Sequence, residues 1–142
     1  MATSEQIAVA NATSRARGAV GKNAIVPRLV RELMPKDRII MDFGAGSEAV
    51  HARALRADGW QGVDAYEFGS NRNSHHITDA DAARVDHMYD CVYASNVLNV
   101  QSDRDMMRET VEQVAYFMHW GGMFIANYPA SPRKSDLSPA EV

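Results

Sequence analysis

Short apolar runs alternate with amphipathic stretches along the chain, and this order predicts an α/β fold with a parallel sheet. Residues 39–41 form the run Ile-Ile-Met, and Asp42 ends it, which is typical of a buried parallel strand. The other apolar runs predict strands over residues 62–68, 75–77, 89–95 and 123–128.

Helices are predicted between these strands, over residues 23–33, 49–58, 78–83 and 102–119. In the second helix, Val50, Ala54 and Leu55 are expected to face inward. Because helices and strands alternate, the crossovers should be right-handed and the sheet Rossmann-like and doubly wound, with about five strands.

The 142 residues are enough for one domain, and a hydrophobic fraction of 46% excludes a disordered chain. No apolar run approaches a membrane span and no signal segment begins the sequence, so a cytoplasmic location is expected. The single cysteine, Cys91, lies in an apolar run, which predicts a buried thiol.

Charge is unevenly distributed. The net charge is −3, yet the segment up to Arg38 has seven basic and three acidic residues, so its balance is +4 and the remainder carries −7. Residues 1–22 therefore form a basic arm, which either meets an anionic partner or is an ordinary solvated surface. Residues 129–142 are rich in proline, serine and charge and are expected to be a loose tail.

A glycine-rich turn follows the first strand. Gly44 and Gly46 come directly after Asp42 and before a helix, as in the first unit of a nucleotide-binding sheet. Glu67 ends the second strand, 25 residues after Asp42, where an acid accepts hydrogen bonds from ribose hydroxyls. The alternatives are a plain strand-to-helix turn and a solvated glutamate.

A metal site is not expected. His75 and His76 are adjacent, so in a strand they point to opposite faces and make a poor chelate. No complete metal-binding constellation is present elsewhere in the sequence.

Four motifs, in the right order over residues 38–128, resemble class I S-adenosylmethionine-dependent methyltransferases. They are the glycine-rich Asp-Phe-Gly-Ala-Gly at residues 42–46, the acid Glu67, the strand and loop at residues 89–98, and the turn with its strand at residues 119–125.

The resemblance implies S-adenosylmethionine as cofactor and assigns roles to single residues. Gly44 and Gly46, with Asp42 and Ala45 of the same motif, would face its methionine and ribose parts. Glu67 would bind the ribose hydroxyls, and Phe68 and Asp79 would contact the adenine. Ser95 and Asn96 would line the methionine side. No catalytic residue is assigned.

Two departures from the family pattern stand out. Glu48 replaces the third glycine. The family strand order is 3-2-1-4-5, followed by a helix and two more strands, and the residues after the fifth strand are too few for these elements.

The expected function is therefore a minimal methyltransferase with an unidentified acceptor, favoured to be a small molecule or a protein. One alternative is a non-catalytic domain for cofactor binding or interaction, and another is a nucleic-acid methyltransferase that uses the basic arm. The apolar edge of the fifth strand predicts a homodimer, with a monomer covered by its own tail as the alternative.

Overall fold

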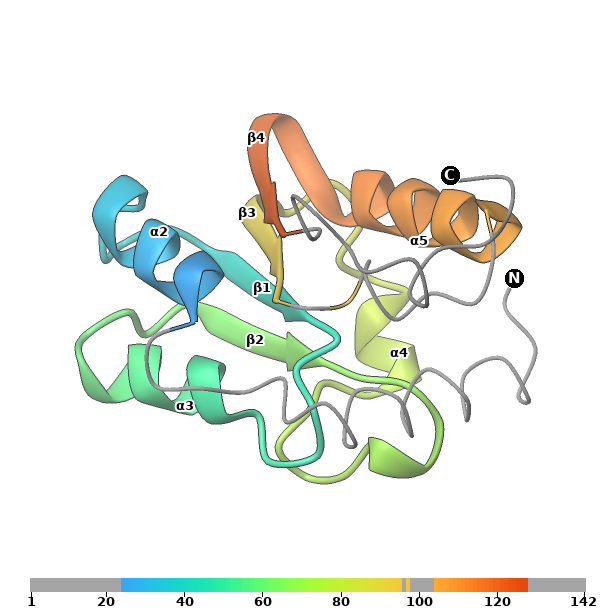
Figure 1. The fold of residues 1–142 in the computed structure, drawn as a ribbon, viewed down its shortest axis with the longest axis horizontal. Coiled ribbons are helices and arrows are strands. Elements are labelled where there is room, and N and C mark those ends of the chain that lie inside the picture. The colour runs from blue at the N-terminus through green and yellow to red at the C-terminus, as the bar shows by residue number, and fades with distance from the viewer. Residues whose placement is uncertain (1–23, 96, 98–103, 128–142) are drawn as a thin grey trace, which may run out of the picture.

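The computed structural model describes residues 24–95, 97 and 104–127 (Figure 1). Its strands form one parallel sheet in the order β2-β1-β3-β4. They are β1 (Ile40–Phe43), β2 (Val63–Tyr66), β3 (Tyr89–Ala94) and β4 (Met118–Ala126). The predicted α/β class and parallel sheet are confirmed and are consistent with a Rossmann-like fold, but the described sheet has four strands instead of five.

Helices cover both faces of the sheet (Figure 1). One face packs against α2 (Ile25–Leu33) and α3 (Val50–Ala57), and the other against α4 (Asp79–Ala82) and α5 (Arg104–Phe117). Strand β1 is buried along its whole length because it lies between β2 and β3 and between the two helix layers. This placement explains why its sequence is mostly apolar. The strand does not end at Asp42 as predicted, because it continues to Phe43 with Asp42 buried inside it.

The predicted strand at residues 75–77 is wrong. Asn73 makes a local turn there, since its Oδ1 accepts from the His75 N–H at 2.9 Å and its carbonyl accepts from the His76 N–H at 3.1 Å. Side-chain bonds of this kind compete with extended structure. One backbone bond, from the Ile77 N–H to the Ala65 carbonyl at 2.9 Å, holds the segment beside β2.

The predicted short helix after this loop is confirmed. Thr78 caps α4, because its hydroxyl accepts from the Asp81 N–H at 3.0 Å while the Asp81 carboxylate accepts from the Thr78 N–H at 3.4 Å. This reciprocal pair is a capping box and fixes where α4 begins.

Strand β4 begins five residues earlier than predicted and is irregular. Tyr89 pairs with Met118 and Cys91 with Met123, so residues 119–122 bulge out between two regular parts. Trp120 in this bulge is 81% exposed and stacks on His87 at 5.2 Å. A bulge of this kind limits the length over which another strand can pair with the edge.

The buried face of α3 also differs from the prediction. Leu55 is buried, but His51 and Ala52 point inward instead of Val50 and Ala54. Ala49 has a φ of 45° and ends the turn, so the helix starts with a different side facing the sheet.

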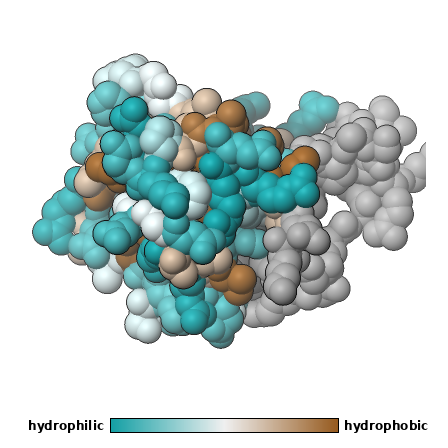
Figure 2. All heavy atoms as spheres, turned by 90° about the vertical axis from the view of Figure 1, so that its left-hand side faces the viewer, coloured by the Kyte–Doolittle hydropathy of each residue, from teal (hydrophilic) through white to brown (hydrophobic). Residues whose placement is uncertain are grey.

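The side of the molecule at the amino ends of β1 and β2 is mostly hydrophilic, and its apolar residues are scattered (Figure 2). Within the described residues, no helix is both long and apolar enough to cross a bilayer. The arm at residues 1–22 and the tail at residues 129–142 lie outside the described residues.

The burial of side chains on the α2–α3 face predicts which leucine substitutions lower the stability of the protein. Leu55 is fully buried and Leu33 is 50% exposed. We expect Leu55→Ala to lower the free energy of unfolding by about 2–5 kcal/mol, because it leaves a cavity. Leu33→Ala, the matched control, should change it by less than about 1 kcal/mol. Urea denaturation followed by circular dichroism measures both, and equal losses in the two variants would contradict this arrangement of the core.

Candidate cofactor site

The glycine turn after β1 lies against the carboxyl end of β2. The N–H groups of Gly44 and Ala45 both donate to the Tyr66 carbonyl, at 2.9 and 3.0 Å. Gly44 and Gly46 have φ values of 72° and 80°, which residues with a Cβ rarely adopt. A Cβ on Gly44 would lie 2.5 Å from a methyl group of Val97, whereas one on Gly46 would meet nothing within 4 Å. Gly44 therefore permits close packing, and Gly46 borders open space.

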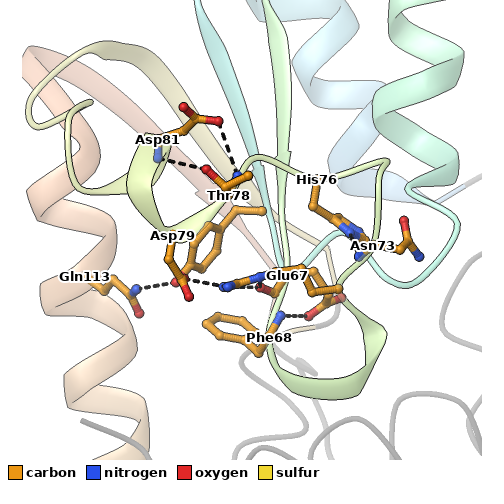
Figure 3. A network of polar contacts seen from close by, with 10 residues as sticks. Glu67, Phe68, Asn73, His76, Thr78, Asp79, Asp81 and Gln113 are labelled. Carbon is orange, nitrogen blue, oxygen red and sulfur yellow. Dashed lines mark hydrogen bonds and ion pairs between the residues drawn. The ribbon is translucent and has the colours of Figure 1, made fainter.

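Glu67 directly follows β2 and joins the end of this strand to the turn. Figure 3 shows its bond to Phe68. Its Oε2 accepts from the Gly46 N–H at 2.5 Å and its Oε1 from the Phe68 N–H at 2.8 Å. Burial raises the pKa of Glu67, and the two N–H groups, with smaller contributions from His76 and Arg72, oppose the rise. The side chain is 4% exposed, so any ligand that reaches it meets a largely desolvated carboxyl group.

Arg72 ties this acid to α4. Its guanidinium donates to the Glu67 carbonyl at 2.9 and 3.1 Å and pairs with the Asp79 carboxylate at 2.5 Å. The same group lies 5.5 Å from the ring centre of Tyr66, whose hydroxyl accepts from the Gln113 amide at 2.9 Å. Arg72 brings Asp79 beside Glu67, and sequence reasoning missed it because one arginine in a polar loop carries no pattern.

On the other side of Glu67, the loop at residues 73–76 contacts the glycine turn. The Asn73 amide donates to the Ser47 carbonyl at 2.7 Å, and His76 Nε2 lies 2.8 Å from the Gly46 carbonyl oxygen. Sequence reasoning weighed His76 only as a metal ligand and missed this contact. Among the described residues, no group of three or more histidine, cysteine, aspartate or glutamate side chains is placed to hold a metal ion.

Phe68 and Ser95 lie on either side of the turn. Phe68 packs edge-to-face on Phe43 and Tyr66, with ring centres 5.3 and 5.2 Å apart, in the aromatic cluster of the α4–α5 face. Ser95 directly follows β3, the neighbour of β1, and its buried Oγ has no hydrogen-bond partner in the described part of the chain. Asn96 lies outside the described residues.

Asp42 lies in β1, one residue before its end, and its side chain points into the α2–α3 core. It pairs in register with Tyr93 of β3 and is 2% exposed. Burial raises the pKa of Asp42 to about 7, and the nearby Tyr93 hydroxyl and Ala52 N–H lower it. Even so, neither Oδ2 of Asp42 nor the Tyr93 hydroxyl has a partner in good hydrogen-bond geometry. Ala45 is likewise buried in this core.

The thiol of Cys91 is buried on the same face, as predicted. Burial, with a contribution from Asp90, raises the pKa of Cys91 to about 12. A thiol that stays protonated in this way is a poor nucleophile.

No known protein-family model matches this chain, and a search of curated proteins finds no match.

Asp42 should make stability depend on pH. The pKa of this carboxyl is about 7 in the folded protein and 3.8 in the unfolded chain, so between these values the folded state binds more protons. Its contribution to stability is fully present below pH 4 and is lost as the pH rises through 7. The loss amounts to at most about 4 kcal/mol.

We therefore expect the free energy of unfolding of the wild type to fall, relative to that of Asp42→Asn, between pH 4 and pH 8. Urea denaturation across this range measures it. Asp37→Asn is the control, because that side chain is 82% exposed and should show no such trend. A pH-independent difference between the wild type and Asp42→Asn would contradict the buried, protonated state of Asp42.

Proposed function

We propose that this protein binds S-adenosylmethionine at the carboxyl ends of β1, β2 and β3 and transfers its methyl group to an acceptor. The proposal rests chiefly on one observation, the contact of the Glu67 carboxylate at the end of β2 with the Gly46 N–H in the turn after β1. In open parallel sheets, ligands bind at these strand ends where the strand order reverses, which here is at β1.

The carboxylate of Glu67 suits a ribose diol. Each of its oxygens accepts one backbone N–H, which leaves further lone pairs for two hydroxyl donors. Because the site is desolvated, such charge-assisted bonds are strong. The open space beside Gly46 lets the sugar approach the main chain. Since burial raises the pKa of Glu67, affinity should fall as the pH drops and the carboxyl takes up a proton.

The adenine is assigned to the side of Phe68 and Asp79. Arg72 holds the Asp79 carboxylate at the first turn of α4, where it can accept from an exocyclic amino group. Phe68 offers a half-buried aromatic ring beside it.

S-adenosylmethionine supplies a methyl group on a sulfonium centre, and the protein contributes orientation toward the acceptor. Ser95, with its unpartnered Oγ after β3, is assigned to the methionine side. The acceptor class we favour is a small molecule or a protein. Turnover of labelled cofactor in the presence of cell extract would distinguish methyl transfer from cofactor binding alone. Binding of nucleic acid that weakens strongly with salt would instead favour a nucleic-acid acceptor contacted by the basic arm.

Loss of the Glu67 carboxylate should weaken cofactor binding. We expect Glu67→Ala to reduce the affinity for S-adenosylmethionine by about 1.5–3 kcal/mol, because charge-assisted hydrogen bonds to the ribose are lost. Isothermal titration calorimetry measures the effect, and circular dichroism checks that the variant is folded.

Glu48→Gln is the control for a general loss of negative charge, because Glu48 lies in the same turn with a side chain that is 69% exposed. Its affinity should match the wild type. Equal affinities of Glu67→Ala and the wild type would remove Glu67 from the site.

A homodimer through β4 completes the proposal. Among the described residues, β4 pairs only with β3, so its other edge has no strand partner there, and Met123 of this strand is exposed. Because residues 119–122 bulge, pairing with a second copy would use the regular part after Gly122. A two-fold contact would cover this edge.

We expect light scattering at micromolar concentration to give the mass of a dimer. Met123→Lys should shift the mass toward the monomer, since it places a charge on the edge where Met123 is 39% exposed. Val50→Lys, at a 46% exposed position on α3, is the control and should leave the mass unchanged. A monomer mass for the wild type, constant on dilution, would overturn the dimer.

A further inference from the structure

The loop at residues 73–76 is bound to the glycine turn by contacts that the proposed function leaves without a role. Figure 3 shows two of its side chains, Asn73 and His76, close to each other. The Asn73 amide donates to the Ser47 carbonyl, and the His76 ring bonds to the Gly46 carbonyl. Two successive peptide groups of the turn are therefore hydrogen-bonded to this loop. These contacts join segments that are 26 and 30 residues apart in the sequence.

The hydrogen bonds of His76 determine its tautomer. The Asn73 N–H donates to Nδ1 at 3.0 Å, so Nδ1 is an acceptor and carries no proton. The proton is therefore on Nε2, which donates to the Gly46 carbonyl at 2.8 Å. The ring is neutral in this arrangement and only 8% exposed.

His76 and Glu67 hold Gly46 from opposite sides. Glu67 accepts from the N–H of Gly46, while His76 donates to its carbonyl, and these two groups flank the glycine Cα. Together they fix the φ of 80° at a residue whose own conformational preference is weak. The Gly46 carbonyl also accepts from the Ala49 N–H at 3.2 Å. Without the ring, this peptide keeps that longer bond but loses the shorter one, so its orientation beside the open space is less firmly held.

We propose that His76 is a positioning residue of the cofactor site, which in its neutral form sets the Gly46 peptide in the orientation that the ligand requires. This inference rests on the proposed function, because the ligand is the one that Glu67 and the glycine turn are proposed to bind. His76 acts through Gly46 and has no part in the chemical step.

Two substitutions separate the two hydrogen bonds of the ring. In His76→Gln the side-chain amide can still reach the Gly46 carbonyl, whereas in His76→Asn the shorter side chain keeps only the acceptor near Asn73. We expect His76→Asn to weaken the binding of S-adenosylhomocysteine by about tenfold and His76→Gln to stay within about threefold of the wild type. His75→Gln is the matched control. The ring of this neighbouring histidine lies 3.9 Å from the exposed Glu48 carboxylate, so the variant should bind like the wild type.

The test is calorimetry with S-adenosylhomocysteine on the full chain, together with nitrogen NMR of the histidine rings without ligand. The proposal expects an Nε2-protonated ring for His76, and clearly weaker binding by His76→Asn than by His76→Gln. Wild-type protein that binds nothing would overturn the proposed function and this inference with it. Wild-type protein that binds while His76→Asn binds equally well would overturn this inference alone, as would an Nδ1-protonated ring.

Discussion

The buried carboxylate of Glu67, bound to the N–H groups of Gly46 and Phe68, is the interaction on which the site depends. Removing this carboxyl from water costs free energy, which is why its pKa is raised, and the two N–H groups recover part of that cost. The bond ties the end of β2 to the turn after β1, so the strand ends and the turn move together. A carboxylate that already holds the main chain of the turn is also oriented for further donors.

Two sets of contacts surround Glu67. Arg72 donates to the Glu67 carbonyl, pairs with Asp79 of α4 and lies over the Tyr66 ring. Asn73 and His76 bind the carbonyl groups of the glycine turn. The connection between β2 and α4 is therefore a rigid part of the site, although the sequence of this loop is mostly polar and contains glycine.

Asp42 lies within β1, on the face of the sheet that packs against α2 and α3. The alternation of the strand sends its side chain into this core beside Tyr93. A carboxyl group buried without a full set of partners favours its protonated form. Stability and the local charge are thus coupled to pH next to the glycine turn.

The sequence by itself determined the α/β class and the order of the elements, apart from the strand expected at residues 75–77. These follow from local signals, since apolar runs, helical spacing and the capping residue Thr78 act within one element. It also predicted the buried thiol of Cys91, because an apolar strand carries it inside.

Tertiary structure decided the rest. Residues 75–77 became a loop because Asn73 and His76 bind the turn and each other, and His51 instead of Val50 faces the core because Ala49 sets the start of α3. Arg72 and His76 gained their roles only when β1 and β2 paired in parallel, which brought Gly46 and Glu67 into contact across 21 residues. Hydrogen bonds between distant segments leave no periodic pattern in a sequence, so they could be seen only in the folded chain.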